Sequence, residues 1–214
     1  MDVRNIRSPE QFRIISEFVD FKDKVVADFG YGYGDIMRMV ADAGARRCVG
    51  FDKDTICATN DDERLLFVNK DIEEIEVSDG SRVITVSGVT KEQFEKIVEA
   101  RKKQETGKYS PLPSITVNQS YDVTDIYVQY DIGICFSVLP YLKKPASFLY
   151  KMKKLCELCL IECQYDGDGP GFSFIKSDAT MAAYLYGVGF REIVPIGKTY
   201  VEGRNKYRTI WMCS

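Results

Sequence analysis

The chain of 214 residues is predicted to form an α/β domain, with a mainly parallel sheet covered by helices on both faces. Short apolar segments alternate along it with segments whose apolar residues recur at helical spacing. The first apolar segment runs into three glycines at alternate positions and then into a helix-like stretch, as a βαβ unit begins. With 45% apolar residues, a chain of this length can bury a substantial core as one domain.

The elements are expected in the following order. A helix begins near Ser8-Pro9-Glu10, because proline suits the first helical position. Strands are expected at about 24–29, 46–52, 114–118, 131–136 and 158–163, and helices at 35–43, 91–104 and 145–155. A last helix begins at Ser177-Asp178 and ends on glycine. Two antiparallel strands then complete the sheet.

The run from Val25 to Gly34 carries the main functional signal. Glycines at 30, 32 and 34 let the backbone turn tightly and approach a bound nucleotide closely. The second strand ends at Asp52, where an acid in a nucleotide-binding βαβ unit takes the ribose hydroxyls. The loop, the helix and the acid-tipped strand together predict a nucleotide-like ligand.

Two features of this run favour S-adenosylmethionine over NAD or FAD, although all three present an adenosine ribose. The glycine spacing lacks the x-x-Gly ending of the dinucleotide fingerprint. Asp28, directly before the loop, suits a ligand with a positive amino group and would repel a pyrophosphate. An NAD(P)-dependent oxidoreductase is kept as an alternative.

These residues resemble the first motif of the class I S-adenosylmethionine-dependent methyltransferases, a strand, an acid and a G-x-G-x-G loop. The resemblance continues through Asp52, through 130–139, and through the ending at 187–193 and 207–213. It implies a seven-stranded sheet whose last strand is antiparallel, and S-adenosylmethionine as cofactor. The implied cofactor-binding residues are Asp28, Gly30, Tyr31, Gly32, Gly34, Asp52, Lys53, Asp122, Val123, Phe136 and Ser137.

Residues 53–89 are extra to this scheme, so residues 1–214 are interpreted as one methyltransferase domain with an insertion at about 53–89. A hairpin with Asp79-Gly80 at its tip is expected inside it, over 74–86. A surface decoration, a substrate lid and a homodimer contact are the roles considered. In a competing register 65–71 is the third strand, with Asp71 in place of Asp122 beside adenine. Asp122 is preferred because 91–104 and 114–118 then lead into the fourth strand without a gap.

The segment 162–172 follows the fifth strand and combines carboxylates with glycines, at the edge where open α/β sheets bind ligands. With 137–141 it is expected to form the acceptor pocket. Because the chain has no histidine, a general base would be another residue type, and Glu162 and Asp166 are the candidates. The predicted function is O- or N-methylation of a small-molecule or sugar-type acceptor. A non-catalytic S-adenosylmethionine-binding or scaffolding protein is the hypothesis from a different class.

Composition weighs against other functions. A net charge of −3, from 29 basic and 32 acidic residues, disfavours nucleic acid as partner. No apolar run reaches the ~20 residues of a membrane span, and the start lacks a signal-peptide core, so a cytoplasmic protein is expected. Cys156 and Cys159 form the only C-x-x-C pair, which indicates packing rather than a metal site. The lack of histidine excludes Ser-His and Cys-His catalysis.

Overall fold

A computed structural model describes residues 7–54, 62–75, 77, 84–87, 123–126, 129–163, 175–201 and 206–214, with the backbone alone at 84–87, 123–126, 201 and 206. The helices are α1 (Ser8–Ser16), α2 (Asp35–Asp42), α4 (Pro145–Leu155) and α5 (Asp178–Val188), with the short 3₁₀ turns η2 (Ile72–Glu74) and η3 (Leu139–Tyr141). The main strands are β1 (Val25–Phe29), β2 (Arg47–Asp52), β3 (Leu65–Asn69), β6 (Tyr130–Phe136), β7 (Cys156–Cys163), β8 (Ile193–Val201) and β9 (Lys206–Cys213). These bounds confirm all the predicted helices and strands within the described residues, except those of the inserted region.

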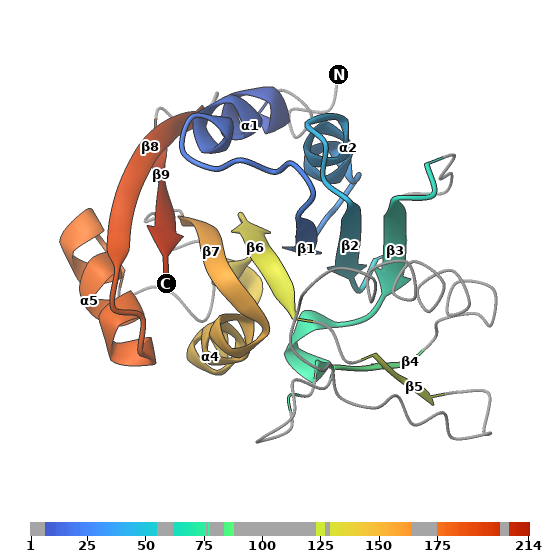
Figure 1. Cartoon of the computed structure of the whole chain (residues 1–214). Helices are drawn as coiled ribbons and strands as arrows, with labels where there is room; N and C mark the ends of the chain where they lie inside the picture. Colours follow the sequence, from blue (N-terminus) through green and yellow to red (C-terminus); the bar gives the residue numbers. More distant parts are fainter. Residues whose placement is uncertain are drawn as a thin grey trace.

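The seven main strands form one sheet in the order β3-β2-β1-β6-β7-β9-β8 (Figure 1). The first five in this order are mutually parallel, and β9 runs antiparallel between β7 and β8. The predicted mainly parallel sheet with an antiparallel last strand is therefore confirmed. Its carboxyl edge gathers the ends of β1, β2, β3, β6 and β7 with the start of β9.

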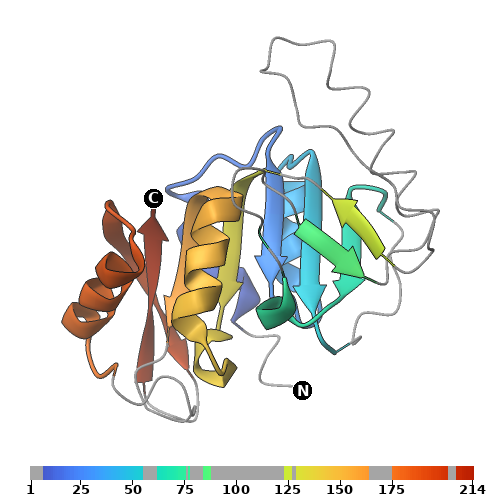
Figure 2. The ribbon, with the colours of Figure 1, turned by 90° about the horizontal axis from the view of Figure 1, so that it is seen from below.

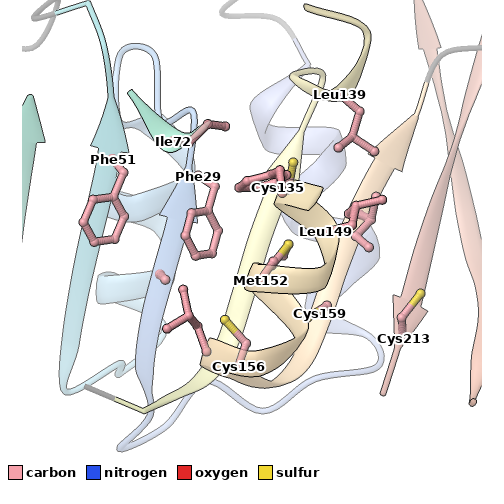
Figure 3. Close-up of a cluster of buried hydrophobic side chains, with 14 of the residues drawn as sticks. Phe29, Phe51, Ile72, Cys135, Leu139, Leu149, Met152, Cys156, Cys159 and Cys213 are labelled. Atoms are coloured by element: carbon pink, nitrogen blue, oxygen red, sulfur yellow. The ribbon is translucent and has the colours of Figure 1, made fainter. Parts of the chain in front are cut away.

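Helices cover both faces of the sheet. Helices α1 and α2 lie on one face, and α4 and α5 lie on the other (Figures 1 and 2). Each face has its own apolar cluster, one around Ile15 and Met37, the other around Leu149 and Met181. Figure 3 shows the second cluster, in which Phe29 and Phe51 from the sheet share an apolar layer with the side chains of α4. Burial of these two layers is the main force that holds the fold together.

Polar contacts fix the ends of the helices that cover the second face. The Ser177 and Thr180 side chains form a capping box at the start of α5, which ends at Gly189 with φ 115°. The Glu73 carboxylate accepts the backbone N–H groups of Lys143 and Lys144, at 3.1 and 2.6 Å, at the start of α4. The turn after β3 is thereby tied to α4.

The third strand of the sheet corrects the preferred register. β3 is Leu65–Asn69, paired parallel with β2 from Cys48 with Leu65 to Asp52 with Asn69. The position beside β2 that was predicted for 114–118 is therefore occupied by 65–69, the segment of the competing register. The prediction was wrong because it counted a helix at 91–104 as the link to the third strand, whereas 53–64 is enough to reach β3. The segments 91–104 and 114–118 lie outside the described residues.

The segment 53–89 is therefore not an insertion throughout, because it contains β3, which belongs to the main sheet. A separate antiparallel pair is formed by β4 (Ile84–Ser87) and β5 (Val123–Ile126), with Ile84 opposite Ile126. It lies on the α4 side of the sheet, near β2 and β3 (Figures 1 and 2). The expected hairpin over 74–86 differs from this pairing, since β4 takes β5 as its partner and Glu74 belongs to η2. The tip at Asp79-Gly80 lies outside the described residues.

Candidate functional site

The glycine loop follows β1 and has the backbone that only glycine adopts easily. Gly30, Gly32 and Gly34 have φ angles of 86°, 54° and 76°. A Cβ on Gly30 would lie 2.2 Å from Val138 Cγ2, and one on Gly34 would lie 2.6 Å from Phe67 Cε1. A Cβ on Gly32 would meet no atom within 4 Å. Gly30 and Gly34 are thus required by packing, and Gly32 alone faces open space where a ligand can approach.

Asp52 ends β2 and holds the loop. Its Oδ2 accepts the Gly32 N–H at 2.9 Å, and its Oδ1 accepts the Asp54 N–H at 3.0 Å. Each oxygen of an ionised carboxylate has a second lone pair, so the half-buried Asp52 can still accept hydroxyl donors. The predicted ribose acceptor therefore lies directly beside the one open position of the glycine loop.

Asp28 lies at the end of β1, under the loop, and is 4% exposed. Burial, and secondarily the negative charge of Asp52, raises the pKa of Asp28 from 3.8 to about 7. A buried carboxyl group whose pKa lies near neutral pH can ionise when a positive group binds beside it. This is the electrostatic setting expected for an acid that receives an amino group.

Two other implied cofactor residues have side chains in the core. Tyr31 is 6% exposed, and its ring centroid lies 5.1 Å from that of Phe67. Phe136 is 9% exposed within the apolar cluster on the α1 and α2 face. Because both side chains are packed in the core, we expect any contact of these two residues with the cofactor to come from their backbones. Lys53 is exposed directly after Asp52.

Asp71, rather than Asp122, follows the third strand of the sheet. Its Oδ1 accepts the Glu73 N–H at 2.9 Å as the cap of η2, which leaves the rest of the carboxylate available. Asp122 lies outside the described residues, and Val123 begins β5, a strand separate from the main sheet. The residue expected beside adenine is therefore Asp71, as in the competing register, and not Asp122.

Glu162 lies at the end of β7 and is fully buried. Its Oε1 accepts Gln11 Nε2 at 2.9 Å and Thr199 Oγ1 at 2.6 Å, and its Oε2 accepts Ser137 Oγ at 2.5 Å. A carboxylate whose oxygens are occupied by three internal donors is badly placed to take a proton from an acceptor. This geometry favours a positioning role over the predicted general base. Asp166 lies outside the described residues.

Two arginines complete this cluster. Arg7 Nη2 donates to Ser137 Oγ at 3.1 Å and Arg208 Nη1 donates to the same oxygen at 2.6 Å, while each guanidinium lies 3.6 Å from Glu162 Oε2. Ser137 itself has a positive φ of 64°, which is unusual for a residue with a side chain. Since its hydroxyl accepts twice and donates once, the Ser137 side chain serves the cluster and is not free for the cofactor.

The sequence contains signals for these partners that the prediction missed. Gln11 interrupts the apolar stripe of α1, three and four positions before Ile14 and Ile15. Arg208 precedes the apolar run of the last strand. Buried polar residues within apolar faces usually pair with one another, but Glu162, the partner of Gln11, is 151 residues away, and Ser137, the partner of Arg208, is 71 residues away.

The glycine geometry predicts opposite outcomes for two matched substitutions. Gly30→Ala should lower the free energy of unfolding by about 2–5 kcal/mol, because it combines overpacking against Val138 with a positive φ. Gly32→Ala should lower the free energy of unfolding by only about 1–2 kcal/mol, because the positive φ is its only unfavourable feature. It should nevertheless weaken S-adenosylhomocysteine binding by at least about tenfold, because its Cβ enters the open space. Urea unfolding and calorimetric titration measure the two effects. Unchanged affinity in Gly32→Ala would show that the loop is only a structural turn.

Among the comparisons with known proteins, the one with solved structures supports the fold. No protein-family model and no curated protein sequence matches the chain. Magnesium protoporphyrin IX methyltransferase from Synechocystis PCC 6803 with bound S-adenosylmethionine is similar with a TM-score of 0.55 and 12% identity, over 99% of this chain and 79% of that one. Its complex with S-adenosylhomocysteine is similar with a TM-score of 0.56 and 13% identity, over 99% of this chain and 83% of that one. An S-adenosylmethionine-dependent methyltransferase from Mesorhizobium loti is similar with a TM-score of 0.54 and 10% identity, over 94% of this chain and 96% of that one.

The chain has the class I methyltransferase fold. In this methyltransferase fold the glycine loop, Asp52, Asp71 and the Ser137–Glu162 cluster all lie at the carboxyl edge of the sheet, as ligand sites of open α/β sheets do. Within the described ranges no helix is long and apolar enough to cross a membrane. The described Cys, Asp and Glu side chains form no group suited to a metal ion.

Proposed function

We propose that this protein is an S-adenosylmethionine-dependent methyltransferase that acts on a small-molecule acceptor. The observation that carries the proposal is the juxtaposition of Gly32, Asp52 and Asp28. A Cβ on Gly32 would meet no atom within 4 Å, and the Gly32 N–H is bound by Asp52, a carboxylate with further lone pairs. The charge of Asp52 in turn acts on Asp28, a buried acid whose pKa is raised to about 7. A ribose suits the first acid, and a positive amino group suits the second. A dinucleotide would instead place its negative pyrophosphate near Asp28, whose ionised form would repel it.

The residues present fit this cofactor. Asp52 would hold the ribose hydroxyls, Asp28 the amino group, Asp71 the adenine amino group, and the Gly30–Gly34 backbone would line the methionine chain. When bound, S-adenosylmethionine supplies a methyl group already activated by its sulfonium. The chain contributes position and exclusion of water, and a correct alignment of two partners is worth up to ~7–11 kcal/mol in ideal systems.

The acceptor is proposed to bind beside Ser137 and Val138. Val138 packs against the glycine loop at Gly30, so the segment after β6 adjoins the cofactor site. The Glu162 network fixes this segment, including the left-handed backbone of Ser137. Because Glu162 is occupied, the proposed mechanism relies on positioning by the site, with Asp166 retained as a candidate base.

Calorimetric titration tests the proposal directly. S-adenosylhomocysteine should bind the wild-type protein, whereas NAD and NADP should give no heat of binding. Heat with NAD and none with S-adenosylhomocysteine would instead establish the oxidoreductase alternative. Binding without methyl transfer to any acceptor would favour the non-catalytic alternative.

Asp52→Ala should weaken S-adenosylhomocysteine binding by roughly 1.5–3 kcal/mol for each hydroxyl bond lost, before water compensates. The reason is that an ionised acceptor makes stronger hydrogen bonds than a neutral one. The same titration measures the effect, and Asp54→Ala is the matched control because only the backbone of Asp54 bonds to Asp52. A loss below about threefold in Asp52→Ala, with a native circular dichroism spectrum, would contradict the ribose role.

A further inference from the structure

The guanidinium of Arg7 contains an unsatisfied polar atom at the carboxyl edge of the sheet. Its Nη1 is buried and makes no hydrogen bond with any described residue, although Nη2 of the same side chain donates to Ser137 Oγ. The nearest carboxylate oxygen, Glu162 Oε2, is 3.6 Å from Nη1. Burial of a charged donor without a hydrogen-bond acceptor is unfavourable, so such a group in a folded protein calls for an explanation.

Glu162 does not supply the missing acceptor in this geometry. Its Oε1 accepts Gln11 and Thr199, and its Oε2 accepts Ser137 and lies 3.6 Å from Arg7 Nη1, which is outside hydrogen-bond distance. The single carboxylate also lies equally close to Arg208, at 3.6 Å. Two guanidiniums thus face one fully buried carboxylate and share one serine hydroxyl, which leaves an excess of one positive charge around Ser137.

The place of this group connects it with the proposed reaction. Ser137 directly precedes Val138, which contacts the glycine loop at Gly30. The Arg7 side chain is 18% exposed although its Nη1 is buried, so an oxyanion that arrives at the carboxyl edge meets the exposed part of this side chain and reaches Nη1 when the guanidinium turns toward it. A guanidinium offers paired N–H donors that match carboxylate and phosphate oxygens.

We infer that the acceptor carries an oxyanion, a carboxylate or a phosphate, and that Arg7 binds this group beside Ser137. The inference rests on the proposed function and narrows its substrate class to acidic small molecules. Arg208 is a positioning residue here, since its hydrogen bond holds the Ser137 hydroxyl. The cofactor also has a carboxylate, so the experiment must separate two sources of the same chemistry.

The experiment compares wild-type protein with Arg7→Gln, Arg7→Lys and the control Arg13→Gln. Arg7 adjoins the start of α1, and Arg13 is an exposed arginine of α1 that forms an ion pair with Glu17. Small molecules from a cell extract are separated on an anion exchanger, and each fraction is incubated with protein and methyl-labelled S-adenosylmethionine. The labelled product should arise from retained, acidic fractions. Arg7→Gln should raise the KM for that acceptor by about 10–100-fold, with kcat and S-adenosylhomocysteine affinity within about threefold of wild type.

Arg7→Lys should recover part of the acceptor affinity, because it keeps the charge but loses the paired donors. Arg13→Gln should match the wild type in every measurement. Acceptor activity confined to unretained fractions would overturn the inference. So would a loss of S-adenosylhomocysteine affinity in Arg7→Gln with an unchanged acceptor KM, because Arg7 would then serve the cofactor's carboxylate.

If no extract fraction is labelled, acetate and inorganic phosphate are titrated into the complex with S-adenosylhomocysteine. A saturable shift of the Arg7 Nε–H resonance, lost in Arg7→Gln, is expected, and its absence overturns the inference. Failure of the wild-type protein to bind S-adenosylhomocysteine would instead reject the proposed function itself. The two failures are therefore distinguishable.

Discussion

Glu162→Ala is expected to lower the free energy of unfolding by about 3–5 kcal/mol, as removal of one partner from a buried ionic group usually does. The substitution leaves Gln11, Ser137 and Thr199 without their shared acceptor, and Arg7 and Arg208 without their common counter-charge. Denaturant unfolding followed by circular dichroism measures the loss. Because Glu162 joins α1, β6, β7, β8 and β9, the effect should extend across that half of the sheet.

A matched control lies on the same strand. Glu157 of β7 is exposed and accepts Gln129 Nε2 at 2.6 Å. Glu157→Ala should change the free energy of unfolding by no more than about 0.5 kcal/mol, as for most surface substitutions. Equal small effects at both positions would show that the buried network contributes nothing to stability.

Asp28→Asn is expected to stabilise the ligand-free protein by up to about 4 kcal/mol at pH 8. The pKa of Asp28 is raised from 3.8 to about 7 in the folded state, so burial of its ionised form is unfavourable. For a raised pKa, the group's contribution to stability is fully present below pH 3.8 and is lost as pH rises through 7. The neutral asparagine avoids this loss. The stabilisation should therefore vanish near pH 3.8 and reach its full size above pH 7, as measured by unfolding at several pH values.

The same substitution should cost the protein its cofactor affinity. In the wild type, S-adenosylhomocysteine binding should strengthen by about tenfold from pH 6 to pH 8, as Asp28 ionises and can meet the ligand's amino group. Titration calorimetry in buffers of different ionisation enthalpy should detect proton release on binding below pH 7. In Asp28→Asn both the pH dependence attributable to this group and the proton release should be absent. An unchanged profile would remove Asp28 from the amino-group site.

Local sequence patterns were sufficient for the elements whose signals lie within a short window. The strand, glycine loop and helix from Val25 to Asp42 have a dense local pattern, and α4 and α5 carry proline and serine signals at their starts. In the same way, Asp28 and Asp52 were placed at the site because each directly ends a strand. These features depend on neighbours in the chain, which is why spacing alone predicts them.

The third strand shows where local patterns are not enough. Both 65–69 and 114–118 are short apolar segments, and only pairing with β2 selects the first. Strand partners are non-local, so no window of sequence distinguishes two similar candidates. Asp71 consequently takes the place after the third strand that had been expected for Asp122.

The sequence by itself determined the fold class, the glycine loop and the two acids that flank it, because these are set by residues adjacent in the chain. Only the tertiary structure decided that Gly32, alone of the three loop glycines, faces open space and that Glu162 is enclosed by partners. Besides Ser137, those partners are Arg7 and Gln11 from the start of the chain, and Thr199 and Arg208 from its end. They meet Glu162 because the antiparallel β9 inserts between β7 and β8, and α1 packs across β8. Side-chain burial and charge pairing arise from this convergence, which the order of residues along the chain does not reveal.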